Sequence, residues 1–162
     1  MLALVFLYSA ITKLRGPGGF RAFRLSVQQM RLLPSGLVGP VAVTVVAAEL
    51  LIPGLLISRF TVLAGLSAAL ALLIALTVAV VLVVRRGSAA PCRCFGASNV
   101  PLGWSHVVRN IGLIIVAALG LVAWASGADQ ATRSAGVIVS LGVALILVFI
   151  AATLDDLVAL FR

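Results

Sequence analysis

Long apolar runs separated by short polar segments dominate the chain. A helix that crosses a bilayer needs about 20 apolar residues, and four runs meet this length: residues 37–57, 61–84, 107–125 and 135–154. A fifth run, residues 1–12, covers only about 18 Å as a helix, against a hydrocarbon core of roughly 30 Å. It has neither the basic start nor the small-residue cleavage site of a signal peptide. We expect it to be a first transmembrane helix that is short or whose beginning precedes Met1.

A different pattern fills residues 16–34. Apolar side chains recur there at helical spacing, and basic or amide side chains follow one position later: Phe20, Phe23, Val27 and Met30, then Arg21, Arg24, Gln28 and Arg31. An amphipathic helix of this kind suits the membrane surface. Leu25 and Leu32 interrupt the stripe, and a solvated helix packed on the bundle is the alternative. We expect the surface-lying helix, ended by Pro34 and Gly36.

The composition supports a membrane protein. The chain has 162 residues, of which 63% are apolar and 10% are charged, whereas a soluble domain carries about 25% charged residues. Lipid must therefore cover much of the apolar surface. We predict an all-α, integral membrane helical bundle in a single domain, residues 1–162. It would have about five transmembrane helices, with a four-helix core, and one amphipathic surface helix. Small residues in the last three runs permit close helix packing.

The net charge of +8 is distributed unevenly between the two predicted faces of the membrane. With five spans, ten basic residues fall on or near one face and two on the other: Lys13, Arg15, Arg21, Arg24, Arg31, Arg85, Arg86, Arg93, Arg109 and Arg162 against Arg59 and Arg133. The positive-inside rule taken alone makes the first face cytoplasmic. The basic residues have no aromatic interleaving and form no nucleic-acid motif, so contact with lipid head groups is the favoured reading and no nucleic-acid partner is expected.

Candidate redox chemistry is concentrated in the loop after the third run, where Cys92-Arg93-Cys94 contains both cysteines of the chain. A disulfide across a single intervening residue would be strained and easily exchanged. Arg93 and the nearby Arg86 would lower the thiol pKa and favour the thiolate that attacks disulfides. These features favour thiol–disulfide exchange, with Cys92 and Cys94 as the redox pair.

Two other readings of the cysteines remain open. The pair can be structural, or it can bind a metal together with His106, the only histidine. A closed zinc site needs four ligands, and the first acidic residue downstream is Asp129. We therefore assign no metal.

Polar residues at the start of the fourth run and inside the second run complete the candidate site. His106, Arg109 and Asn110 share one helix face by their spacing, and His106 is a candidate proton shuttle because imidazole titrates near neutral pH; an interfacial belt is the alternative role for this group. Glu49 lies near the middle of the second run, where an ionised carboxylate is expensive. It should point into the bundle, either protonated or paired with Arg109 or Lys13.

The motifs together resemble one family. Residues 6–14 (FLYSAITKL), Ala48-Glu49-Leu50, residues 92–96 (CRCFG) and Arg109-Asn110 are similar to the MauE family of DoxX-like membrane proteins. The resemblance covers residues 1–125, and the C-terminal span at 135–154 is additional. It implies a small helical bundle distantly like vitamin K epoxide reductases and DsbB-type oxidases. It also implies maturation of an extracytoplasmic disulfide-containing client, such as methylamine dehydrogenase, with a thioredoxin-like partner, in a bacterial cell membrane.

The chain departs from the wider group in having one cysteine pair where quinone-linked oxidases use two. The single pair favours exchange with a redoxin over a relay to a quinone cofactor. The resemblance places the cysteine loop outside the cell, in an oxidising compartment, whereas the charge asymmetry places it inside. A non-catalytic assembly or export factor, and a small-molecule or lipid carrier using Glu49, are the alternative functions.

Overall fold

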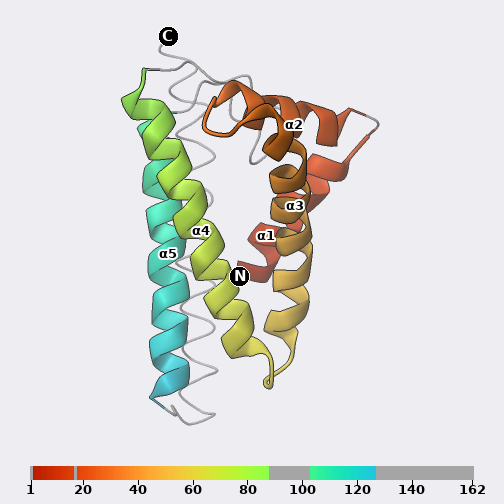
Figure 1. The fold of residues 1–162 in the computed structure, drawn as a ribbon. Helices are drawn as coiled ribbons and strands as arrows, with labels where there is room; N and C mark the ends of the chain where they lie inside the picture. Colours follow the sequence, from red (N-terminus) through yellow and green to blue (C-terminus); the bar gives the residue numbers. More distant parts are fainter. Residues whose placement is uncertain (1, 17, 88–102, 127–162) are drawn as a thin grey trace, which may run out of the picture.

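The computed structural model describes residues 2–16, 18–87 and 103–126, and these ranges contain five helices and no strand. The helices are α1 (Leu2–Leu14), α2 (Gly19–Gln29), α3 (Ser35–Ile57), α4 (Val62–Arg85) and α5 (Trp104–Ala125). The all-α prediction is confirmed (Figure 1). The predicted span at 135–154 and the cysteine motif at 92–94 lie outside the described residues.

Helices α3, α4 and α5 are each long and apolar enough to cross a membrane. They correspond to three of the predicted runs, 37–57, 61–84 and 107–125, with boundaries that differ by at most three residues. Helix α1 is apolar but has only 13 residues, which is shorter than a candidate span, so its expected role as a first transmembrane helix stays a prediction. The prediction of a membrane helical bundle is thus confirmed in the part of the chain that the structure describes.

The long helices pack as successive hairpins, α3 against α4 and α4 against α5, while α1 packs on α3 (Figure 1). One apolar core joins four of the helices: Leu2 and Phe6 of α1, Ile52 of α3, Leu66, Ala69 and Leu73 of α4, and Leu113 and Ala117 of α5. Glycine permits close approach at the α3–α4 turn, where a Cβ on Gly65 would lie 3.1 Å from the Leu55 Cβ. The short α1 is therefore part of the bundle core.

Helix α2 lies across one end of the bundle (Figure 1). Its apolar face packs on α3, where Phe23 joins a core cluster with Ala42 and Val46, while Arg21 and Arg24 are exposed. The predicted amphipathic helix is present, and protein covers much of its apolar stripe. These contacts place α2 on the end of the bundle with its basic side chains exposed, and its position at the membrane surface stays a prediction.

The basic residues gather at the end of the bundle where α2 lies. Met30, just after α2, packs with Val83 near the end of α4 and Val107 near the start of α5, so these helix ends meet there. The described basic residues at this end are Lys13, Arg15, Arg21, Arg24, Arg31, Arg85, Arg86 and Arg109. Arg59 lies in the α3–α4 turn at the opposite end (Figure 1). The predicted charge asymmetry is confirmed for the described residues.

The turn from α1 to α2 depends on the absence of a side chain at Gly19. A Cβ there would lie 2.7 Å from the Lys13 carbonyl oxygen, whereas a Cβ at Gly18 would meet no atom within 4 Å. We expect Gly19→Ala to destabilise the protein by about 1–3 kcal/mol and Gly18→Ala to change its stability by less than about 0.5 kcal/mol. Unfolding of the two purified variants in the same detergent measures this difference, and equal stabilities would contradict it.

Candidate functional site

A buried polar cluster joins α1 to α3. Ser9 and Lys13 are four residues apart and therefore share one face of α1. The Ser9 hydroxyl donates to Glu49 Oε1 over 3.0 Å, and Lys13 Nζ donates to Ser9 Oγ over 3.1 Å. Lys13 Nζ also forms an ion pair with Glu49 Oε1. Ser9, Lys13 and Glu49 are 1%, 3% and 2% exposed, so the pair is shielded by protein.

Helix α2 completes the surroundings of the lysine. Lys13 Nζ lies 4.6 Å from the centre of the Phe23 ring, a distance typical of a cation–π contact. Glu49 Oε2 is buried without a hydrogen-bond partner among the described residues. The carboxylate is thus held through one oxygen, and the lysine contacts groups from three helices.

The ion pair agrees with one of the two partners predicted for Glu49. Lys13, the only lysine of the chain, pairs with the only glutamate, and an ion pair reduces the cost of placing either charge at membrane depth. The contributions of Ser9 and Phe23 were not predicted. A polar residue four positions before a lysine in an otherwise apolar helix was the available signal for Ser9.

The opening of α5 carries a second group of polar side chains. His106 and Asn110 are buried, Arg109 is half-buried and Val108 is exposed, so the first two face the bundle and Arg109 lies at the edge of that face. Asn110 Oδ1 has no hydrogen-bond partner among the described residues. Trp104 is exposed, as expected for an aromatic side chain at the membrane interface.

The remaining predicted site residues, Cys92, Arg93 and Cys94, lie outside the described ranges. The described residues on either side of this segment are Gly87 and Gly103. Both lie at the basic end of the bundle, because α4 ends and α5 begins at that end. Within the described ranges, no three His, Cys, Asp or Glu side chains group closely enough to hold a metal ion.

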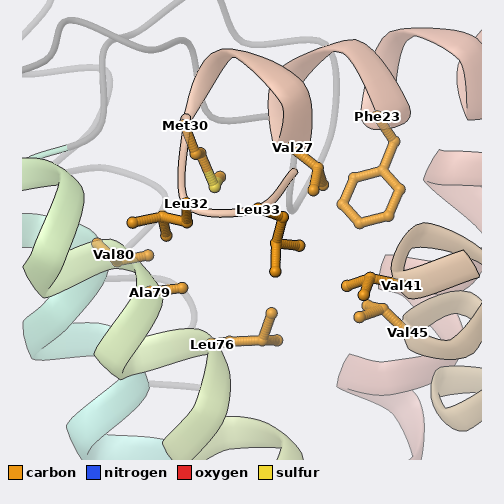
Figure 2. A pocket seen from close by; sticks show the side chains of 10 residues that line it. All are labelled: Phe23, Val27, Met30, Leu32, Leu33, Val41, Val45, Leu76, Ala79 and Val80. Carbon is orange, nitrogen blue, oxygen red and sulfur yellow. The ribbon is translucent and has the colours of Figure 1, made fainter. Parts of the chain in front are cut away.

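An apolar cavity of about 170 Å³ lies beneath α2 (Figure 2). Its lining comes from three helices, α2, α3 and α4, and from the connection between α2 and α3. The lining residues are Phe23, Val27, Met30, Leu32, Leu33, Val41, Val45, Leu76, Ala79 and Val80. Phe23 both lines this cavity and contacts Lys13. The Phe23 ring therefore lies between the cavity and the buried ion pair, and it contacts both.

Helices α3, α4 and α5 are long and apolar enough to span a membrane, and a buried ion pair connects the short α1 to α3. This arrangement defines an integral membrane helical bundle. The model of one family, described as methylamine utilisation protein MauE, matches residues 1–123. The chain belongs to the MauE family, and the family's name places it in the context of methylamine utilisation. Comparisons with curated proteins and with solved structures give no match.

Proposed function

We propose that the protein carries out thiol–disulfide exchange through Cys92 and Cys94, and so supports disulfide formation in an extracytoplasmic client. The observation that carries this proposal is the Cys92-Arg93-Cys94 motif in the segment that connects α4 to α5. Two cysteines this close in sequence make a strained disulfide that exchanges readily. Membership of the MauE family supports the link to maturation of a client such as methylamine dehydrogenase.

The exchange transfers two electrons from the client to a redoxin. A client thiolate attacks the Cys92–Cys94 disulfide, forming a mixed disulfide and releasing one cysteine as a thiolate. A second client thiolate then attacks the client sulfur of the mixed disulfide, which leaves a client disulfide and a reduced Cys92–Cys94 pair. A thioredoxin-like partner in its disulfide form accepts the two electrons and restores the pair. No quinone is needed for this balance.

The chain supplies charges that suit the exchange. Arg93 between the cysteines, and Arg86 at the end of α4, favour the thiolate forms. His106 opens α5 on the bundle-facing side, and it is our candidate to take up and return the thiol protons. Lys13–Glu49 fastens α1 to α3, and its role in this proposal is to hold the scaffold.

The side of the membrane is part of the proposal. Client oxidation requires an oxidising compartment, so we place the cysteine segment on the outer face of a bacterial cell membrane. The positive-inside rule predicts the opposite orientation, because the described basic residues gather at this end. If the basic residues at this end bind a client or lipid head groups on the outer face, this function would account for the departure from the positive-inside rule.

Labelling in intact cells tests side and redox state together. We expect a membrane-impermeant maleimide to label Cys92 and Cys94 from outside the cell. Molecules that carry the Cys92–Cys94 disulfide should be labelled only after a reductant has been added. Mass-tagging after acid quenching measures that fraction. Cysteines that stay reduced and unreactive under oxidant would overturn the redox proposal, and labelling only after the cells are opened would reverse the orientation.

A further inference from the structure

We propose that the cavity beneath α2 binds one acyl chain of an anionic phospholipid, whose phosphate contacts Arg31 and Arg86. The proposal goes beyond thiol–disulfide exchange and does not depend on the cysteines. It rests on the lining of the cavity, on the charges beside it and on the conformation of the segment that joins them.

The lining favours a hydrocarbon occupant. All ten described lining residues are apolar, and their side chains converge from above and from both sides (Figure 2). A quinone ring here would lose the hydrogen bonds that water gives its carbonyl oxygens, which is costly. The volume resembles that of engineered apolar cavities of about 150 Å³, which stay dry and bind benzene. A few carbons of an acyl chain fit this volume, and the remainder of the lipid stays in the bilayer.

The charges beside the cavity favour an anionic head group. Arg31 lies between Met30 and Leu32, which both line the cavity. Arg86 Nη1 donates to the Arg31 carbonyl oxygen over 3.5 Å, so the two guanidinium groups belong to neighbouring segments, and both residues are exposed. Guanidinium groups bind phosphate through directed hydrogen bonds. Basic residues at the bilayer surface attract anionic lipids.

The backbone at Arg31 brings these two features together. Arg31 has φ of 50°, a left-handed conformation that a non-glycine residue seldom adopts. Its N–H donates to the Gln28 carbonyl oxygen over 3.1 Å as α2 ends. This turn sends Met30 and Leu32 to the cavity while the Arg31 residue remains exposed. A glycine would adopt the turn more easily, but it would carry no charge.

Phe23 closes the side of the cavity next to the ion pair. Its ring contacts Lys13 Nζ and also lines the cavity. The acyl chain would therefore meet an aromatic ring in place of an ammonium group. An occupant here packs α2 against α3 and α4, which supply the other walls.

Photocrosslinking on the full-length protein in lipid nanodiscs tests the site. The probe is phosphatidylglycerol with a diazirine on one acyl chain, and the same probe on phosphatidylcholine is the comparison. We expect phosphatidylglycerol to label peptides that contain the lining residues of α2 and α4. Arg31→Gln with Arg86→Gln should lower this labelling about tenfold, while Arg59→Gln, at the opposite end, should leave it unchanged.

A second pair of variants tests the cavity itself. Ala79→Phe would fill it, whereas Ala75→Phe adds the same ring to an exposed position of α4 outside the lining. We expect only Ala79→Phe to abolish labelling of the lining peptides. Equal labelling by both lipids would overturn the head-group assignment, and labelling unaffected by Ala79→Phe would overturn the cavity assignment. If Ala79→Phe does not fold, the arginine variants, changed at exposed positions, still decide the proposal.

Discussion

Replacing Glu49 by glutamine is expected to lower the free energy of unfolding by about 3–5 kcal/mol, because a buried charge is left without its partner. Lys13 is 3% exposed and its Nζ pairs with Glu49 Oε1, so water cannot replace the lost carboxylate without opening the contact between α1 and α3. Lys13→Met should destabilise the protein to a similar extent by leaving Glu49 uncompensated. Unfolding of each purified variant by increasing SDS in mixed micelles measures these changes.

The double variant Lys13→Met, Glu49→Gln separates the ion pair from the packing around it. Removing both charges removes both desolvation penalties, so we expect the double variant to be more stable than either single variant. Arg59→Gln, which removes an exposed charge at the other end of the bundle, should change stability by less than about 0.5 kcal/mol. Additive losses in the double variant would show that the two side chains act independently.

The long helices of this chain could be predicted from the sequence because they must be apolar to lie in lipid. A segment that crosses a bilayer must be apolar over about 20 residues, and no other arrangement satisfies its backbone as simply, so α3, α4 and α5 were predicted to within a few residues. The amphipathic segment was also recognised, because its basic and apolar positions separate at helical spacing.

The contacts that place the buried cluster could not be predicted in the same way. The apolar run ends at Thr12, whereas helix α1 continues to Leu14 and includes Lys13, whose charge is paired with Glu49. Glu49 is 36 residues away in sequence, and no local pattern chooses between Lys13 and Arg109 as its partner. The contact with Phe23 depends on how α2 folds back over α1. Periodicity defines faces of helices, whereas these pairings are set by how the helices pack.

Replacing both cysteines by serine should abolish disulfide formation in the client. The Cys92→Ser, Cys94→Ser variant has no disulfide to accept client electrons, so client oxidation should fall to the level of cells that lack the protein. The two positions lie outside the helices that form the described core, and we therefore expect the variant to accumulate in the membrane at the normal level. Alkylation of client thiols followed by gel mobility measures client oxidation.

The single variants distinguish catalysis from assembly. With one cysteine left, the protein cannot form its own disulfide, and attack of the remaining thiolate on the redoxin disulfide stops at a mixed disulfide. We expect one of Cys92→Ser and Cys94→Ser to accumulate this species, visible on non-reducing gels after acid quenching and lost on reduction. A double variant that still matures the client would indicate a non-catalytic assembly factor, because a docking surface needs neither sulfur. The same result would leave the ion pair and the lipid site unaffected, since both are built from side chains of the described helices and the turn after α2.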